Sequence, residues 1–541
     1  MILPGSDQFQ KNRAFMLEYV GRVRDVQACI AAGEQKHAER ARKAGKLLPR
    51  ERLGRLLDLD APFLELCPIA GYRMYGDSDG STAGGNLIAG IGFVSGRRCL
   101  VIVWNYAIKG GTISRVTTQK MLRLQEIARR QRLPIVSLSE SGGGNLEGGG
   151  GADPWGAYAF IEGGLCYCQQ AELSAAGIPQ IVVAHGNATA GGAYHVALSD
   201  YIVLVRGQTQ LFLAGPPLLR AATGEIAEAE ELGGAELHAR VSGTGEYLAE
   251  DDADGIRIAR AIVAQLPPAP ALAAERASEP PRFDADELAG IVPADPKQFY
   301  DVRELIARIA DGSRFLDFAP EIDQGTVCGH IQLGGHRAAV IGNNAPITPN
   351  GAKKAAGFLQ LCDQSDTPVF FLQNTTGFLV GREAEQQGQV KHGAKLIQAV
   401  ANARVPKIAL VVGNSYGAGN YAMASRALKP DFVFAWPTAR SAVMGGAQAA
   451  KVIRIVALGK LARAGVATPD EATQKLLDDQ AGAIEAGLDA TSEAMHCSAR
   501  LFDDGIIDPR DSRKVLLLAL ETCLEGRRAE PRPNTFGVAR F

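Results

Sequence analysis

The strongest constraint on the fold is an internal repeat that relates the two halves of this 541-residue chain. Residues 178–194 (IPQIVVAHGNATAGGAY) match residues 405–421 (VPKIALVVGNSYGAGNY) without a gap. A second pair of segments, 133–144 and 367–378, lies upstream in both halves at a slightly different spacing. Because the matches keep their order, the repeat indicates two copies of one domain.

Proline-rich sequence separates the two copies. Residues 266–296 contain the clusters LPPAP, EPP and VPADP. Proline fixes φ and removes a backbone donor, so this segment is a poor helix or strand and a good linker. The sequence therefore predicts one domain at residues 1–265, a linker at 266–296 and a second domain at 297–541.

Each copy has the same predicted local order. A helical stretch such as 119–130 or 352–361 precedes a short, continuous apolar run, and a glycine-rich loop and another helical stretch such as 393–403 follow. Continuous apolar runs between helices are typical of buried parallel strands in β-α-β units. The fold class is therefore predicted as α/β, with ligands bound beyond the carboxyl ends of the strands.

Composition excludes several other classes of protein. The 57 basic and 59 acidic residues give a net charge of −2, whereas a dedicated nucleic-acid binder carries a basic excess. No run of 18 apolar residues predicts a membrane span, and the first residues do not resemble a targeting peptide. The nine cysteines are scattered without a CxxC pair, which predicts free thiols in a reducing cytoplasm and no metal site.

The two glycine clusters can hold negative charge. A glycine-rich turn that opens a helix exposes backbone N–H groups with no intrahelical acceptor, and the helix dipole adds partial positive charge there. Such a cluster can also be no more than a tight turn. Because the cluster recurs in register, we expect two oxyanion-binding sites, one for an enolate and one for another polarised carbonyl, with a cofactor supplying the difficult chemistry.

Other chemistries fit less well. Neither cluster has the Gly-Lys-Ser/Thr of a P-loop or a Rossmann fingerprint. Residues 413–417 (GNSYG) do fit the nucleophile elbow of a serine hydrolase, but Ser415 corresponds to Ala188 in the first copy, so the copies share glycines and not a hydroxyl. His185 and His195 flank the first cluster, where packing or loop hydrogen bonds are the expected roles.

At this point the motifs resemble those of a known family. The chain resembles the carboxyltransferase (β) subunit of biotin-dependent acyl-CoA carboxylases, in the methylcrotonyl-CoA and geranyl-CoA carboxylase branch. The motifs that carry the resemblance occur in order along nearly the whole chain: GKLLPRER (45–52), KGGT (109–112), TAGGAY (189–194), FLAGPPLLRAATG (212–224), NTTGFLVG (374–381), HGAK (392–395), GAGNY (417–421), VMGGAQAA (443–450) and DDGIIDP (503–509).

The resemblance implies a fold of two tandem crotonase-like β-β-α spiral domains. It implies that CO2 moves from carboxybiotin to the enolate of an acyl-CoA, with acyl-CoA bound by the first domain and carboxybiotin by the second. Biotin would be carried by a biotin carboxylase/carboxyl carrier α subunit, and the chain would form dimers within a hexamer in an α6β6 complex. No metal, nucleic acid or membrane is implied, and we expect a cytoplasmic enzyme.

The resemblance also implies roles for the residues of this chain that match the motifs of the family. The implied catalytic groups are the amides of Gly191, Gly192, Ala418 and Gly419. Acyl-CoA binding is implied for Gly142, Gly143, Gly163, Gly164, Ala193, Tyr194 and Lys109. Biotin binding is implied for Gly377, Phe378, Tyr416 and Gly417.

One departure from the family bears on the substrate. Methylcrotonyl-CoA enzymes carry a Phe-Gly pair where this chain has Gly163-Gly164. A missing ring would enlarge an acyl pocket, so the resemblance favours a long, branched 3-methyl-2-enoyl-CoA such as geranyl-CoA over 3-methylcrotonyl-CoA.

Two alternatives remain open from sequence: a decarboxylase subunit of the same family, and a non-catalytic crotonase-like binding subunit. Separately, the charged segment 34–55 is predicted to form a basic helical surface that meets CoA phosphates or a partner subunit, or is simply solvated.

Overall fold

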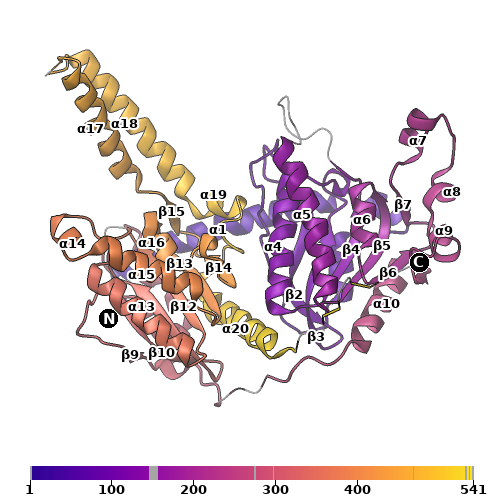
Figure 1. Cartoon of the computed structure of the whole chain (residues 1–541), viewed down its shortest axis with the longest axis horizontal. Coiled ribbons are helices and arrows are strands. Elements are labelled where there is room, and N and C mark those ends of the chain that lie inside the picture. Colours follow the sequence, from indigo (N-terminus) through magenta and orange to yellow (C-terminus); the bar gives the residue numbers. More distant parts are fainter. Residues whose placement is uncertain are drawn as a thin grey trace. The chain divides into compact units, whose positions relative to one another are not determined.

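The computed structural model describes residues 3–144, 156–272, 274, 276–295, 298–466, 468–530, 533–534 and 537–538. The chain divides into two compact units, each with its own sheet (Figure 1). Unit 1 comprises Met1–Val23, Ala273–Ser498 and Phe502–Leu520, and unit 2 comprises Arg24–Leu272, Ala499–Leu501 and Glu521–Phe541. Each half of the chain supplies the sheet of one unit, while a terminal segment joins the unit of the other half. The exact domain boundaries stay a prediction.

The sheet of unit 2 has the strand order β1-β2-β3-β4-β5-β6-β8, and β7 pairs with β5. Strands β1 to β3 pair antiparallel, and the pairs from β3 to β8 are parallel. The strands are β1 (Leu64–Glu65), β2 (Leu87–Val94), β3 (Arg97–Trp104), β4 (Ile135–Ser141), β5 (Gln180–Thr189), β6 (Tyr201–Val205), β7 (Gln210–Phe212) and β8 (Tyr247–Ala249).

The sheet of unit 1 repeats this order as β9-β10-β11-β12-β13-β14, and β15 pairs with β13. Its antiparallel hairpin is again followed by parallel strands. The strands are β9 (Leu316–Asp317), β10 (Thr326–Leu333), β11 (His336–Asn343), β12 (Val369–Thr375), β13 (Lys407–Tyr416), β14 (Phe432–Ala435) and β15 (Arg440–Ala442).

The central strands are buried on both faces, which explains their continuous apolar runs. In unit 2, one face of the sheet packs against α3 (Pro49–Leu56) and α10 (Asp252–Gln265), which share a core cluster with strand residues such as Val136 and Val183. Helices α4 (Arg115–Gln131) and α5 (Gly156–Ala175) pack against each other (Figure 1). The remaining helices of this unit are α2 (Ala38–Lys43), η1 (Lys109–Gly111), α6 (Gly191–Ala197), α7 (Pro216–Thr223), α8 (Ala229–Gly233) and α9 (Ala235–Arg240).

Unit 1 has matching helices and one addition. Helices α13 (Pro349–Gln364) and α15 (Gln389–Asn402) pack together as α4 and α5 do, and α17 (Gly446–Arg463) and α18 (Glu471–Ser492) form a long hairpin (Figure 1). The other helices are η2 (Ala285–Glu287), α11 (Leu288–Ile291), α12 (Arg303–Ile309), η3 (Asp311–Ser313), α14 (Arg382–Gln386), α16 (Gly417–Ala422), η4 (Arg426–Leu428), α19 (Ala494–Ala499) and η5 (Pro509–Asp511). Helices α1 (Asp7–Gln35) and α20 (Ser512–Arg528) each contribute residues to both units.

Two segments differ from the simplest sequence expectation. Segment 34–55 is not one basic helical surface, because α1 ends at Gln35 and two residues of the segment are buried inside unit 2: Glu34 accepts from the backbone N–H of Arg50, and Arg52 binds Asp252. The proline-rich segment 266–296 contains α11, whose residues are buried because Leu288 and Ile291 pack into unit 1. Among the described residues, no helix has the length and apolar character needed to cross a membrane.

Candidate functional site

The first glycine cluster forms the turn between β5 and α6. Strand β5 ends at Thr189, Ala190 adopts a left-handed φ of 51°, and α6 begins at Gly191. Gly191 and Gly192 are the first residues of this helix, so their N–H groups have no intrahelical acceptor. This turn therefore presents two adjacent backbone donors of the kind that stabilise an oxyanion.

Close packing explains why both positions are glycine. A Cβ atom on Gly191 would collide with the hydroxyl of Tyr167, and a Cβ atom on Gly192 would lie 3.2 Å from Cβ of Ser141. Tyr167 comes from α5 and Ser141 from the end of β4. The turn is thus enclosed by the two elements that flank it.

A cavity of about 40 Å³ lies beside Gly191 in unit 2. It is lined by residues of α4, α5 and α6, by the end of β3 and by the loop before α4: Trp104, Ile113, Thr117, Thr118, Met121, Gly163, Cys166, Tyr167, Gln170, Gly191 and His195. The structure therefore brings Gly163 and Gly191 to one cavity. A Cβ atom on Gly163 would meet no other atom within 4 Å, so a larger side chain has room there.

His195 forms the polar wall of this cavity. Its Nδ1 lies 3.0 Å from Oε1 of Gln170, its Nε2 lies 3.2 Å from Oγ of Ser137, and its ring packs 5.7 Å from that of Trp104. Nδ1 therefore donates to the carboxamide oxygen, and Nε2 accepts from the serine hydroxyl. Burial lowers the pKa of His195 to about 4, so this ring is neutral at neutral pH.

The other predicted acyl-CoA residues surround the turn less closely. Gly143 has a left-handed φ of 83° and its carbonyl accepts from Ile113, and Gly142 donates to the carbonyl of Gly110. Ala193 is buried in α6, whereas the half-exposed ring of Tyr194 meets that of Tyr167 edge-on.

Of the predicted acyl-CoA residues only Gly163 is among the described residues that line the cavity; Gly142, Gly143, Gly164, Ala193, Tyr194 and Lys109 are not. Lys109 Nζ lies 3.4 Å from the carbonyl oxygen of Tyr75 on the surface. The glycine-rich segment 145–155 lies outside the described residues.

A buried ionic cluster lies beside the strand end that packs against the first glycine turn. Arg52 Nη1 donates to Glu140 Oε2 over 2.8 Å, and Arg52 Nε donates to Asp252 Oδ2 over 3.0 Å. Lys46 also binds Glu140, at 2.5 Å, and His185 Nδ1 lies 2.7 Å from Asp252 Oδ1. Glu140 precedes Ser141, the residue that packs on Gly192, so the cluster fixes the strand end that supports the turn.

The groups of this cluster shift each other's ionisation. Burial raises the pKa of Asp252, but the hydrogen bond from His185 and the charge of Arg52 outweigh it and lower that pKa to about 2. Burial and the nearby Arg52 charge lower the pKa of His185. Asp252 is therefore an anion and His185 is neutral at neutral pH.

Sequence reasoning missed this cluster, although a signal was present. Glu140 directly follows an apolar strand sequence, and a carboxylate in a buried strand must be paired. The basic motif 45–52 supplies the partners Lys46 and Arg52. The expectation that His185 and His195 serve packing and hydrogen bonding is confirmed by their full burial and by their contacts.

The second glycine cluster forms the equivalent turn in unit 1. Strand β13 ends at Tyr416, and α16 begins with Gly417, Ala418 and Gly419. Gly417 has a left-handed φ of 57°, and a Cβ atom on Gly419 would lie 2.8 Å from Cα of Gly377. The close approach of these two glycines leaves the first amides of α16 available at the end of the strand.

Other residues predicted on this side support the turn. Gly377 has a φ of 117° and its N–H donates to Oγ1 of Thr375, while the ring of Phe378 packs on Gly393 of α15. Ser415 is fully buried and donates to Gln373 Oε1 over 2.6 Å. A nucleophilic serine is exposed and donates to a general base, whereas Ser415 is buried and donates to a carboxamide, so the hydrolase alternative is wrong.

Comparison with known proteins defines the class of this chain. Residues 40–536 match the model of the carboxyl transferase domain, and the chain belongs to this family. The β subunit of geranyl-CoA carboxylase from P. aeruginosa, a crystal structure, superposes with a TM-score of 0.91 at 53% identity, covering 100% of this chain and 99% of that one.

Curated relatives give the particular branch. A biotin-dependent 3-methylcrotonyl-coenzyme A carboxylase beta1 subunit from Mycobacterium tuberculosis is 45% identical over 94% of this chain and 95% of its own length. A probable methylcrotonoyl-CoA carboxylase beta chain from Drosophila melanogaster is 42% identical over 99% of this chain and 94% of its own length.

The protein is therefore the carboxyltransferase component of a biotin-dependent acyl-CoA carboxylase of the methylcrotonoyl-CoA and geranyl-CoA branch. These findings confirm the family, the tandem crotonase-like fold and the class of activity that the motifs predicted.

Proposed function

We propose that the amides of Gly191 and Gly192 bind the thioester oxygen of an acyl-CoA and that those of Ala418 and Gly419 bind the ureido oxygen of carboxybiotin. The observation that carries this assignment is the equivalent position of the two turns. Each follows the central parallel strand of its sheet, β5 or β13, and each opens a short helix. Backbone donors in such a turn need no reorganisation when charge develops on the bound oxygen.

The residues of the acyl-side turn stabilise the enolate. Negative charge that forms on the thioester oxygen when the substrate loses a proton is held by the two amides and by the dipole of α6. For a 3-methyl-2-enoyl thioester this charge is conjugated with the γ carbon, where the carboxyl group adds. Bound carboxybiotin supplies the carboxyl group and a basic ureido nitrogen. His195, neutral and bonded at both nitrogens, shapes the cavity and does not act as the base.

The residues present on the second turn fit a planar ureido group. Gly419 packs directly on Gly377, so a Cβ atom on Gly419 would lie 2.8 Å from Cα of Gly377 and would disturb the turn. Tyr416 and Phe378 add aromatic surface near this turn. Lys109, Gly142, Gly143, Ala193 and Tyr194 are proposed to contact the acyl-CoA around the first turn.

The substrate is proposed to be a long, branched 3-methyl-2-enoyl-CoA, with geranyl-CoA favoured over 3-methylcrotonyl-CoA. Gly163 supports this preference because it lines the cavity that contains Gly191 and carries no side chain to close it. The relatives named above include a 3-methylcrotonyl-CoA carboxylase subunit and a geranyl-CoA carboxylase subunit, so similarity alone does not choose between the two substrates. The proposed preference for geranyl-CoA therefore depends on the cavity at Gly163.

The functional assembly is proposed to include a biotin-carrying α subunit and several copies of this chain, arranged as a hexamer within an α6β6 complex. The sequence contains no carboxyl-carrier Ala/Val-Met-Lys-Met motif, which agrees with the proposal that a separate α subunit carries the biotin. A cytoplasmic location remains a prediction.

The test is an acyl-CoA screen of the chain coexpressed with its α subunit, using bicarbonate and ATP. Wild type is expected to carboxylate geranyl-CoA and Gly163→Phe to lose this activity selectively. Gly164→Phe is the matched control, since Gly164 is the next residue on α5, is exposed and lies outside the cavity lining.

Equal loss of short and long substrates in Gly163→Phe would contradict the pocket assignment. Absence of ATP-dependent carboxylation, with decarboxylation of a carboxyacyl-CoA instead, would show that the complex runs in the opposite direction.

A further inference from the structure

The internal repeat allows equivalent positions in the two units to be compared residue by residue. Ser139 and Ser141 of β4 pair with β5 as Gln373 and Thr375 of β12 pair with β13. Glu140 therefore corresponds to Asn374. An equivalent contact in each unit supports this match. A Cβ atom on Gly186 of β5 would collide with the side chain of Glu140, and a Cβ atom on Gly413 of β13 would collide with the side chain of Asn374.

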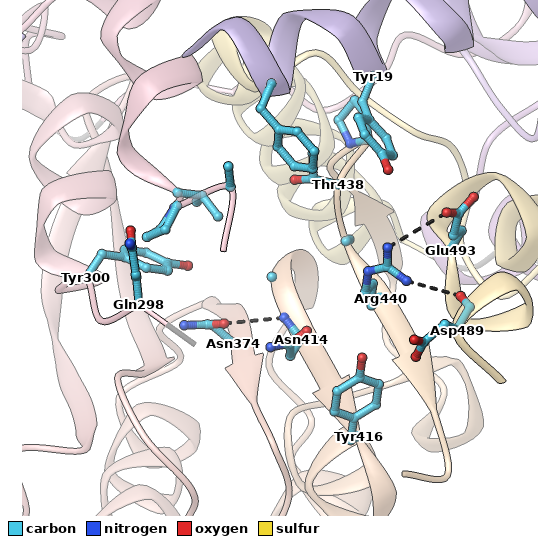
Figure 2. A pocket seen from close by; sticks show the side chains of 17 residues that line it. Tyr19, Gln298, Tyr300, Asn374, Asn414, Tyr416, Thr438, Arg440, Asp489 and Glu493 are labelled. Atoms are coloured by element: carbon cyan, nitrogen blue, oxygen red, sulfur yellow. Dashed lines mark hydrogen bonds and ion pairs between the residues drawn. The ribbon is translucent and has the colours of Figure 1, made fainter. Parts of the chain in front are cut away.

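The surroundings of these two positions differ. In unit 2, Lys46 and Arg52 fill the space around Glu140 with the buried ionic cluster. In unit 1, a cavity of about 270 Å³ lies beside Asn374 (Figure 2). The second copy of the domain thus has an open cavity where the first copy has charged side chains.

Tyr300 is the least satisfied group of this cavity. Its side chain is only 5% exposed, yet its hydroxyl has no hydrogen-bond partner within the described part of the chain. Figure 2 shows this hydroxyl directed into the cavity. A buried hydroxyl without a partner destabilises the ligand-free chain, and a bound ligand that supplied a partner would remove this cost.

The interior of the cavity is neutral and has both donors and acceptors. Asn374 receives a hydrogen bond from the N–H of Asn414 at 3.3 Å, which leaves its amide nitrogen available. The carboxamides of Asn414 and Gln298 also line the cavity. Phe15 and Tyr19 of α1 also line the cavity and give it aromatic surface, and Figure 2 shows Tyr19 at its edge.

Charged groups occur at one end. Arg440 donates to the carbonyl of Asp489 over 3.1 Å, and a second guanidinium nitrogen lies 3.7 Å from the Glu493 carboxylate. The two carboxylates of Asp489 and Glu493 against one guanidinium make this end slightly negative. A phosphate is therefore disfavoured there.

We propose that this cavity binds a small, uncharged, planar heterocycle whose edge carries both a donor and an acceptor, as a nucleobase or a cyclic urea does. The ring would pack against the aromatic side chains of α1, and its edge would bond Tyr300 and Asn374. Ala418 and Gly419 do not line this cavity, whereas Tyr416, which directly precedes α16, does. It does not depend on the function proposed above.

The test is a binding titration of the purified full chain, by calorimetry, with adenosine, 2-imidazolidinone and AMP. At least one of the two uncharged probes is expected to bind, and adenosine is expected to bind more tightly than AMP. Tighter binding of adenosine indicates a nucleobase site, and tighter binding of 2-imidazolidinone indicates a ureido site. Failure of both uncharged probes at 10 mM (roughly the weakest affinity that such a titration resolves) would overturn the proposal.

Two variants locate the binding. Tyr300→Phe is expected to weaken binding about fivefold to tenfold, which corresponds to one hydrogen bond, and to leave the melting temperature of the ligand-free chain equal or higher. Ala294→Phe is expected to fill the cavity and abolish binding. Tyr247→Phe, at an exposed tyrosine of unit 2, is the matched control and should change neither quantity. Unchanged affinity in Tyr300→Phe and Ala294→Phe would place the ligand elsewhere and refute the site.

Discussion

Arg52 and Glu140 form a buried ion pair, with 2.8 Å between Nη1 and Oε2 and side-chain exposures of 0% and 9%. Arg52 belongs to α3, and Glu140 lies one residue before Ser141, which packs against the acyl-side turn. The pair therefore connects a helix outside the proposed site with the strand end that supports the amides proposed to bind the oxyanion. Its loss should affect both folding and the position of the turn.

The first prediction concerns the stability of this cluster. Arg52→Met leaves Asp252 without its guanidinium partner and should lower the free energy of unfolding by about 3–5 kcal/mol, as expected for breaking a buried pair. The measurement is the denaturant midpoint at constant chain concentration. Arg240→Met, which removes the exposed Arg240–Glu236 pair, should change the free energy of unfolding by only about 0–1 kcal/mol. Similar midpoints for both variants would show that the cluster does not stabilise unit 2.

The second prediction concerns pH. An unfolded histidine takes up a proton near pH 6.5, whereas the pKa of buried His195 is lowered to about 4. The unfolded state therefore binds more protons between these values, and stability should fall by up to about 3 kcal/mol as pH decreases from 6.5 to 4.

The check for His195 is the difference between wild type and His195→Gln in unfolding free energy against pH. The variant should have a flatter curve between pH 6.5 and 4. Asp252 affects stability in a different pH range. Because its pKa is lowered to about 2, the stability that its carboxylate contributes is lost only as pH falls from about 4 to about 2. Parallel curves for the two chains above pH 4 would contradict the burial argument.

The third prediction concerns the second turn. The side chain of Ala418 is exposed, so Ala418→Gly should leave carboxyl transfer nearly unchanged. Ala418→Pro removes the N–H at the second position of α16 and should reduce the rate about 10²–10³-fold. The rate is measured in the assembled complex, with the KM for acyl-CoA as a readout that should not move. Equal rates for the two variants would exclude this amide as a donor.

The fold and the two turns were predictable from sequence because they depend on local and repeated patterns. The matched segments 178–194 and 405–421 became β5 with α6 and β13 with α16, and the helical stretches 119–130, 352–361 and 393–403 became α4, α13 and α15. Continuous apolar runs predict buried strands, and glycine clusters predict turns, from residues that are neighbours in the chain.

The buried ionic cluster was not predicted because its members are far apart in sequence. Glu140 and Asp252 lie 88 and 200 residues from Arg52 in the sequence, so only the folded chain brings them together. The cavity at Asn374 is equally invisible, since it arises where the second copy lacks the charged partners of the first. Pairwise contacts of this kind require coordinates.

The most direct test of the central claim isolates one backbone amide. Gly191 is the first residue of α6, where proline fits a helix, but any Cβ atom there meets the Tyr167 hydroxyl. Tyr167→Phe removes that hydroxyl. In this background Gly191→Ala and Gly191→Pro place similar bulk at the turn and differ mainly in the N–H group.

The measurement is acyl-CoA carboxylation by the assembled complex carrying each double variant. Gly191→Ala/Tyr167→Phe should keep most of the rate of Tyr167→Phe alone, whereas Gly191→Pro/Tyr167→Phe should lose about 10²–10³-fold. Equal rates for the two double variants, with both chains folded, would contradict the assignment of the Gly191 amide as an oxyanion donor.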